Sequence, residues 1–341
     1  MNIRVLKFAG TVLVAVLVMF STVFAQNAQP LKIRIGWVVP VANWPSILFE
    51  KPGIAKHLGK SYILEPLRFQ GSAPMITAMA TGDLDIGDLA YSTFALAIQN
   101  AHMNDLRVIA DEFQDVEGYG GNEFMVLKDG PVRKVEDLKG KVIAINAVGT
   151  GADMAVRVML RKHGLDPSRD VTIVEAAFPN MKAMLAEKKA DLVTGVIPFS
   201  LDPQLRAISR TLFTQEEALG PSQSILWAAR AGFLQKNRPA MVDFMEDALR
   251  AVHFYLDPAN HDEVVQIASR VSKLPPQAFS DWIFTKKDQY RDPNLLPNLK
   301  SLQANIDLQR EIGYLNTKID VTKYVDLSIV QEAAKRLGTS R

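Results

Sequence analysis

The stretch from Leu138 to Pro167 constrains the fold of this chain more than any other part of the sequence. Its first part, Lys141 to Asn146, is a short apolar run of the kind that forms a buried strand. Ala147 to Gly151 supplies the glycines of a tight connection, and a helix is predicted to follow, with Gly164 at its left-handed C-terminal cap. A buried strand that turns directly into a helix is typical of an α/β protein.

The turn of this unit indicates binding rather than bond-breaking. Thr150 is followed three residues later by Asp153, a pattern that predicts a capped helix start. The first N–H groups of a helix have no intrahelical partner, and glycines let the backbone approach closely. Gly149 to Ala152 can therefore hold an anion or the polar edge of a ligand. The plainer alternative is an ordinary strand-to-helix connection.

The first residues of the chain predict the cellular location of the protein. Arg4 and Lys7 precede an apolar run from Phe8 to Phe20, and Val23-Phe24-Ala25 is a small-residue cleavage site. We expect residues 1–25 to be a secretory signal peptide, cleaved after Ala25. The apolar run is too short for a comfortable membrane span, so the mature protein is expected to be soluble and located in the periplasm.

The charge balance and the absence of cysteine narrow the class of protein. Residues 1–25 contain two of the 39 Lys and Arg residues and none of the 37 Asp and Glu residues, so cleavage leaves 37 of each. The charges are interspersed, which does not favour a nucleic-acid partner. Without cysteine the exported fold has no disulfides and depends on buried apolar area. With 48% hydrophobic residues, we expect two lobes.

Further strand-to-helix units precede the first one described. Leu31 to Val39 alternates like a strand that Pro40 ends, and Asn43 and Trp44 then open a helical segment running toward Lys56. Trp44 follows a strand end, where α/β folds bind ligands, so it is either a ligand contact or a core aromatic residue.

Two more junctions place small or hydroxyl residues at predicted helix starts. The strand Tyr62 to Phe69 leads into a helix that Ser72 is predicted to cap. Asp83 to Asp88 is a short alternating strand, and Tyr91-Ser92-Thr93 begins the next helix. Asp83 and Asp85 are expected on the wet face of that strand, whereas Asp88, at its exit, is a candidate ligand contact.

Two glycine-bearing segments divide the chain, and the familiar catalytic motifs are missing. Glu117 to Asn122 and Leu219 to Ser222 bound an α/β lobe of roughly 100 residues, and the signal after Phe233 is almost entirely helical. The five histidines show no metal-ligand spacing, and no nucleophile elbow or phosphate-binding glycine loop occurs. We therefore expect no catalytic residue, no metal and no cofactor.

Several blocks resemble the nitrate/sulfonate/taurine group of ABC-importer substrate-binding proteins. They are Leu31-Lys-Ile-Arg-Ile-Gly-Trp37, the block from Phe69 to Gly87 that ends in Gly-Asp-Leu-Asp-Ile-Gly, and Leu138-Lys-Gly-Lys-Val-Ile-Ala-Ile145 through Gly164-Leu-Asp-Pro167. The resemblance covers nearly the whole mature chain. The enzymatic thiamine-precursor branch of the same fold is disfavoured, because it relies on a cysteine-rich motif.

The resemblance implies an α/β protein of the type II periplasmic-binding-protein fold, with two α/β lobes, a hinge and a cleft between them. Lobe one would comprise residues 26–117 plus 226–341, and lobe two residues 118–225. Strand-end loops would hold the ligand in the cleft. The ligand-binding residues expected on this basis are Asn43, Trp44, Gln70, Gly71, Ser72, Asp88, Tyr91, Ser92, Thr93, Asn146, Val148, Gly149, Thr150, Gly151, Pro198 and Trp227.

The loops favour one class of ligand within that group. The loop Val38 to Trp44 is apolar, the loop after Asn146 lacks the arginine or serine often seen in sulfonate binders, and Tyr91, Phe199 and Trp227 add aromatic area. We expect a small organic anion, sulfonate- or taurine-like or an aromatic carboxylate. The partners would be a membrane permease and its ATPase, and the protein a monomer.

Two alternatives remain open at this point. An exported enzyme on the same fold would have to use Asp88, Tyr91 or Ser92. A ligand-sensing partner of a membrane receptor would have the same sequence features as a transport protein.

Overall fold

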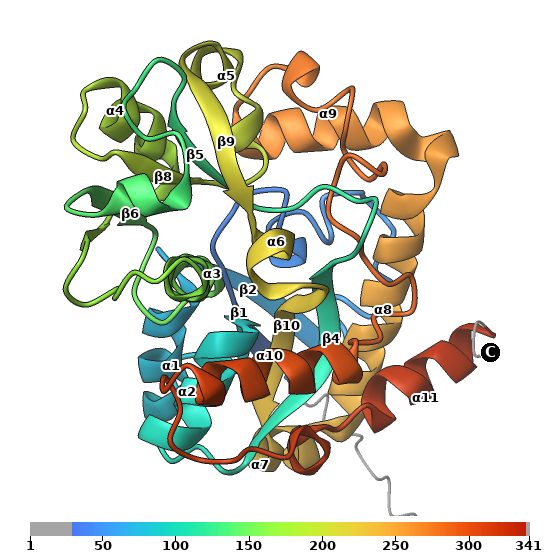
Figure 1. Cartoon of the computed structure of the whole chain (residues 1–341). Coiled ribbons are helices and arrows are strands. Elements are labelled where there is room, and N and C mark those ends of the chain that lie inside the picture. The colour runs from blue at the N-terminus through green and yellow to red at the C-terminus, as the bar shows by residue number, and fades with distance from the viewer. Residues whose placement is uncertain (1–28, 339–341) are drawn as a thin grey trace, which may run out of the picture.

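The computed structural model describes residues 29–338, so the predicted signal peptide lies outside the described residues. Figure 1 shows two β-sheets, one above the other, each covered by helices. The first sheet contains β1 (Leu31–Trp37), β2 (Tyr62–Arg68), β3 (Ile86–Ala90), β4 (Leu106–Asp115) and β10 (Ser222–Arg230). The second contains β5 (Glu123–Leu127), β6 (Val142–Ile145), β7 (Thr172–Glu175), β8 (Leu192–Gly195) and β9 (Ser209–Thr214).

Helices cover both faces of each sheet. They are α1 (Ser72–Thr81), α2 (Tyr91–Asn100), α3 (Gly151–Lys162), α4 (Met181–Ala186), α5 (Pro203–Ile208), α6 (Gln215–Leu219), α7 (Ala231–Lys236), α8 (Arg238–Leu256), α9 (His261–Ser272), α10 (Leu299–Glu311) and α11 (Ser328–Leu337). Apolar residues of α1, α2 and α10 pack on one face of the first sheet, and those of α8, α9 and α11 on the other. In the second sheet α3 covers one face, and α4 and α5 cover the other.

Both sheets have the same mixed topology. In the first, with strand order β2-β1-β3-β10-β4, β1 is parallel to β2 and β3, and β10 runs antiparallel between β3 and β4. In the second, with order β7-β6-β8-β5-β9, β6 is parallel to β7 and β8, and β5 runs antiparallel between β8 and β9. Residues 116–122 and 215–221 connect the sheets, and β10 pairs with the first sheet from Ser222 onward.

The unit around Thr150 folds as its sequence predicts. Thr150 is the N-cap of α3, where its side chain accepts a hydrogen bond from the Asp153 N–H group. The Asp153 carboxylate accepts in turn from the Gly149 N–H group at 2.8 Å, so the two ends of the turn are tied together. Gly164 follows the helix with a φ of +75°, the left-handed conformation that glycine adopts without strain.

Three local predictions are wrong. The strand predicted over Asp83 to Asp88 instead spans Ile86–Ala90, so Asp88 lies within β3 and not at its exit. The segment from Asn43 toward Lys56 is not a helix beyond the single 3₁₀ turn Trp44–Ser46, and turns follow it. Pro52 and Gly53 prevent a helix from continuing to Lys56, because proline has no N–H group to donate to a preceding carbonyl and Gly53 has a φ of +78°. Ser72 does not cap α1: Gly71 occupies the cap position, and the Ser72 hydroxyl instead bonds the Thr93 hydroxyl at 2.7 Å.

One apolar cluster runs through both sheets. It contains Leu89 and Phe94 from the first sheet and its helix α2, together with Ile143 and Val158 from the second sheet and α3. A separate cluster packs α8 and α11 against the other face of the first sheet. Burial of apolar area is the main favourable term in folding, so the α2–α3 contact stabilises the arrangement of the two sheets as well as each sheet itself.

Strand β4 carries buried carboxyl groups in the middle of the structure. Glu112 is completely buried and accepts hydrogen bonds from the Trp44 backbone N–H group and the Trp227 indole N–H group. Asp111, also completely buried, accepts from Gln223 Nε2 at 2.6 Å. Burial disfavours the charged form and raises the pKa of Glu112 to about 8 and that of Asp111 to about 7.

The raised pKa of Glu112 predicts a pH dependence of stability. The unfolded chain loses this proton near pH 4.5, whereas the folded protein keeps it to about pH 8. Folded Glu112 thus binds more protons than unfolded Glu112 in this window, and its contribution to the free energy of unfolding falls as the pH rises from 5 to 8. Over this range we expect the free energy of unfolding of the wild type to fall by roughly 1–3 kcal/mol more than that of Glu112→Gln.

Urea denaturation at pH 5, 6.5 and 8 measures this difference. The quantity to compare is the change in the free energy of unfolding with pH. Its absolute value is not comparable, because glutamine leaves one N–H group without its acceptor. Glu117→Gln is the matched control, since Glu117 is exposed on the segment that follows β4. Equal pH slopes for the wild type and Glu112→Gln would show that Glu112 is not the titrating group.

Candidate ligand-binding site

A narrow cavity lies where the carboxyl ends of parallel strands from the two sheets meet. Its volume is about 60 Å³, or about 570 Å³ when all the space between its wall atoms, open solvent included, is counted. Such strand ends are the usual place for a ligand in α/β proteins. The residues around it are Val38, Val39, Ala42, Asn43, Ser72, Asp88, Ala90, Phe113, Asn122, Asn146, Thr150, Gly151, Ala152, Phe178, Val196, Gln215, Ser224 and Ile225.

The start of α3 forms one wall of this cavity. Thr150, Gly151 and Ala152 line it, and within the described part of the chain their backbone N–H groups donate to no protein acceptor. A helix N-terminus carries a partial positive charge. These N–H groups can therefore donate hydrogen bonds to an anionic ligand group without a cationic side chain. This is the chemistry that the sequence predicts for the turn.

Six of the sixteen predicted ligand residues line the cavity: Asn43, Ser72, Asp88, Asn146, Thr150 and Gly151. The loop after β1 is held by Asn43, whose Oδ1 accepts from the N–H groups of Val38 and Val39 at 3.0 and 2.7 Å. The hydroxyl of Thr150 donates to Asn146 Oδ1 at 3.0 Å. These bonds fix both loops against the cavity.

Five other predicted residues lie at the contact between the two sheets and are not among the residues around the cavity: Gln70, Gly71, Ser92, Thr93 and Gly149. The hydroxyls of Ser92 and Thr93 both donate to the Gly149 carbonyl at 3.0 Å. Gln70 Nε2 donates to the Asn146 carbonyl at 3.1 Å. These polar groups join the loops of one sheet to the loops of the other.

Gly71 lies at the closest approach of the two sets of loops. A Cβ atom at this position would lie 3.0 Å from Asn146 Nδ2 and 3.1 Å from the Ala147 side chain. Only a residue without a side chain fits here without moving its neighbours.

The structure places five further predicted residues away from the cavity. Trp44 and Trp227 are completely buried, Trp44 stacked on Phe284 and Trp227 on Phe244 at centroid distances of 5.3 and 5.8 Å. Burying these large rings in the aromatic core of the first sheet stabilises that sheet and removes them from the cavity. The others are Tyr91, buried beside α3, Val148, exposed at the surface, and Pro198, on the wall of a separate hollow.

Sequence analysis missed three polar residues on the cavity wall, Asn122, Gln215 and Ser224. All three lie at or next to the segments that connect the sheets. Gln215 Nε2 and the Ser224 hydroxyl both donate to the Asp115 carboxylate, which is buried at the end of β4. The signal that could have found them is the pair of glycine-bearing connections, because both connections of such a fold pass beside the cleft.

Asp88 differs from every other residue around the cavity. It is the only charged side chain among those lining residues in the described chain, and its exposed fraction is 1%. Neither carboxylate oxygen accepts a hydrogen bond from any described protein group. Burial, and then the negative charge of Glu112, raise the pKa of Asp88 well above its ordinary value.

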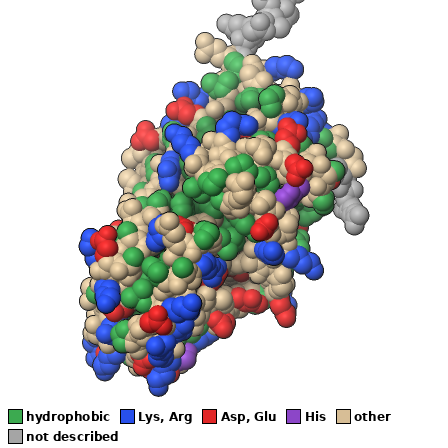
Figure 2. Space-filling view, turned by 90° about the horizontal axis from the view of Figure 1, so that it is seen from above, with side chains coloured by type: hydrophobic (Ala, Val, Ile, Leu, Met, Phe, Trp, Pro, Cys, Tyr) green, Lys and Arg blue, Asp and Glu red, His purple; other side chains and the backbone are tan. Residues whose placement is uncertain are grey.

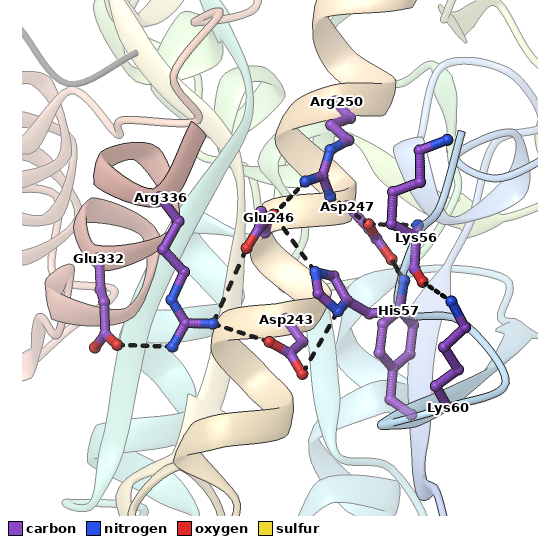
Figure 3. A network of polar contacts seen from close by, with 10 residues as sticks. Lys56, His57, Lys60, Asp243, Glu246, Asp247, Arg250, Glu332 and Arg336 are labelled. Carbon is purple, nitrogen blue, oxygen red and sulfur yellow. Dashed lines mark hydrogen bonds and ion pairs between the residues drawn. The ribbon is translucent and has the colours of Figure 1, made fainter. Parts of the chain in front are cut away.

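A second cluster of titratable groups lies outside the cavity (Figure 3). His57, Asp243 and Glu246 bring their ligating atoms within 4.8 Å of one another, which is a metal-compatible spacing. Arg336 binds Asp243 at 2.9 Å, however, and Arg250 pairs with Glu246. A metal ion would have to displace both guanidinium groups, so we interpret the cluster as an ion-pair network that joins α8, α11 and the loop after residue 55.

The described surface shows no segregation of charge in the view of Figure 2, where Lys and Arg are interspersed with Asp and Glu around exposed hydrophobic side chains. Among residues 29–338, no helix combines the length and the apolar character needed to cross a membrane.

The chain is similar to known binding proteins in sequence and in structure. It is 26% identical over 213 residues to the taurine-binding periplasmic protein of Escherichia coli (strain K12), a match that covers 61% of each protein. The alkanesulfonate-binding protein SsuA from Xanthomonas axonopodis pv. citri, bound to MOPS, superposes with a TM-score of 0.68, 19% identity and coverage of 88% of this chain and 99% of that one.

Two further solved structures have the same fold. The periplasmic nitrate-binding protein NrtA from Synechocystis PCC 6803 has a TM-score of 0.70 at 15% identity, covering 90% of this chain and 89% of that one. The desulfurization enzyme DSZB has a TM-score of 0.65 at 14% identity, covering 90% and 99%. At these identities the structural matches show the fold alone, and they confirm the predicted type II periplasmic-binding-protein fold.

The family is shown by the sequence itself. The family model described as NMT1-like matches residues 26–269, more than half of the chain. This match covers β1 to β10 and therefore both sheets and the cavity between them. The chain belongs to the NMT1-like family and is related to the sulfonate-, taurine- and nitrate-binding periplasmic proteins.

Proposed function

We propose that this protein is the periplasmic solute-binding component of an ABC importer, which captures a small organic anion and delivers it to a membrane permease with its ATPase. One observation carries this proposal: a partly open cavity at the strand ends of two sheets, with one wall formed by N–H groups of the α3 N-terminus that donate to no described protein acceptor. The acid group of the ligand, sulfonate or carboxylate, would bind at those N–H groups.

The apolar part of the wall supports an organic ligand rather than a bare inorganic anion. Val39, Phe113, Phe178, Val196 and Ile225 line the cavity beside its few polar groups. Apolar walls with a small number of placed polar groups are typical of sites for small organic molecules.

The two sheets with their helices would act as lobes that close on the ligand. Residues 116–122 and 215–221 would serve as hinge segments, so that lobe two corresponds to the second sheet and the whole of β10 belongs to lobe one. The described arrangement has the loops in contact through Gly71, Gln70 and the Gly149 carbonyl, as in a closed form. A ligand that touches both lobes stabilises that form by its differential affinity for it.

The candidate catalytic groups support binding rather than turnover. The hydroxyl of Ser92 donates to the Gly149 carbonyl, and the Tyr91 hydroxyl has no hydrogen-bond partner among the described residues. An activated nucleophile needs a base within hydrogen-bond reach, and neither hydroxyl has one. The enzyme DSZB shows that the fold can support catalysis, so consumption of a ligand must be measured alongside its binding.

A thermal-shift screen tests the proposed function. The mature protein is screened against alkanesulfonates, taurine, aromatic carboxylates, nitrate and pyrimidines, and the ligand is recovered to check for turnover. A ligand at a hundred times its Kd adds about 2.7 kcal/mol, which raises Tm by several degrees. We expect a shift with at least one organic sulfonate or carboxylate and none with nitrate. A ligand that is consumed, or no shift with any organic anion, would contradict the proposal.

Substitution of Gly71 tests lobe closure. Gly71→Val places two additional methyl groups against Asn146 and Ala147, so the loops cannot reach the described contact. We expect the affinity for the ligand found in the screen to fall at least about tenfold in calorimetry, because the closed form becomes less populated. Gly232→Val is the control, since a side chain at Gly232 in α7 meets no atom within 4 Å. Unchanged affinity in Gly71→Val would refute closure at this point.

A further inference from the structure

The two sides of the cavity present different polar groups. The α3 side presents backbone N–H groups and the positive end of a helix. The first-sheet side presents Asp88, with Glu112 and Asp115 buried nearby on β4. No Lys, Arg or His belongs to the described residues around the cavity.

Asp88 has no structural partner that accounts for its burial. Strand pairing places it opposite Trp227, between Ile86 and Ala90 on β3, with apolar neighbours on its own strand. Its two carboxylate oxygens are buried and accept from no donor among the described residues, although most buried carboxylates are paired. The other buried acids differ: Glu112 accepts from two N–H groups, and Asp115 from three side chains.

We propose that the ligand is zwitterionic, and that Asp88 binds its positively charged amine while the N–H groups at the start of α3 bind its acid group. This inference rests on the proposed function, since it specifies the ligand of the same cavity. A protonated amine supplies the donors and the charge that the Asp88 carboxylate lacks, and a desolvated ion pair of this kind is strong and specific. Aminosulfonates and amino acids with a separated amine fit this chemistry, whereas simple alkanesulfonates satisfy only the α3 side.

Isosteric ligands that differ only at the amine test the proposal. Taurine, isethionate and ethanesulfonate share a sulfonate and a two-carbon chain and carry an ammonium, a hydroxyl and a hydrogen, respectively. 4-(Aminomethyl)benzoate and 4-(hydroxymethyl)benzoate form the corresponding aromatic carboxylate pair. We expect calorimetry on the wild-type protein to show at least a tenfold preference for the amine in whichever series binds.

The variant Asp88→Asn connects this preference to the residue. It keeps the size of the side chain and removes the charge, so the preference for the amine should disappear, with at least a tenfold loss of affinity for the amine-bearing compound only. Asp83→Asn, at an exposed aspartate five residues earlier, should leave unchanged both the preference for the amine and the affinity for the amine-bearing compound. Circular dichroism confirms that each variant is folded.

The unliganded protein supplies a second measurement. A carboxylate without a partner in a buried site destabilises the free protein, so Asp88→Asn should raise its Tm at pH 8 by about 2–4 °C. A lowered Tm would show that Asp88 supports the fold and would overturn the proposal.

The outcomes separate this proposal from the proposed function. Equal affinity for amine and hydroxyl compounds, or a screen ligand without a cationic group, would overturn the zwitterion and leave the binding function intact. A preference for the amine that survives in Asp88→Asn would also overturn it. If no organic anion or zwitterion binds at all, the proposed function fails and this inference fails with it.

Discussion

The pairing of β10 between β3 and β4 is the constraint on which the rest of the structure depends. Without β10, the first sheet would separate into β2-β1-β3 on one side and β4 alone on the other. Because β10 follows the second sheet in the chain, this pairing also requires the chain to cross between the sheets twice. Its register sets Trp227 opposite Asp88; the Trp227 indole donates to Glu112, and Asp88 is among the residues around the cavity.

The cavity combines groups that the chain supplies from distant positions. The loop after β1, the end of β3 and the start of α3 meet there because the parallel strands of each sheet direct their carboxyl ends to the gap between the sheets. The acids of β4 accept hydrogen bonds from protein donors, whereas Asp88 accepts none from any described residue. An unsatisfied group of this kind costs stability, which is expected where a protein reserves a side chain for its ligand.

In the ion-pair network of Figure 3, the carboxylates have protein partners, unlike Asp88. There, Asp247 is completely buried and accepts from the N–H groups of Lys56 and His57 and from the Tyr62 hydroxyl. Every carboxylate of this cluster has a cationic or N–H partner, so the cluster stabilises the packing of α8 without chemistry of its own. The Asp88 carboxyl group, in contrast, accepts no hydrogen bond from any described residue.

The sequence by itself determined the fold class and the strand-to-helix unit at Thr150, because periodicity, caps and turn glycines act within a few residues. It also singled out Asp88 as a candidate ligand contact, although Asp88 lies within β3 and not at the predicted strand exit. Only the tertiary structure decided that Trp44 and Trp227 pack in the core, that Ser92 and Thr93 join the loops of the two sheets, and that Gln215 and Ser224 line the cavity. Those outcomes depend on which faces of distant strands meet, and local sequence patterns do not predict such contacts.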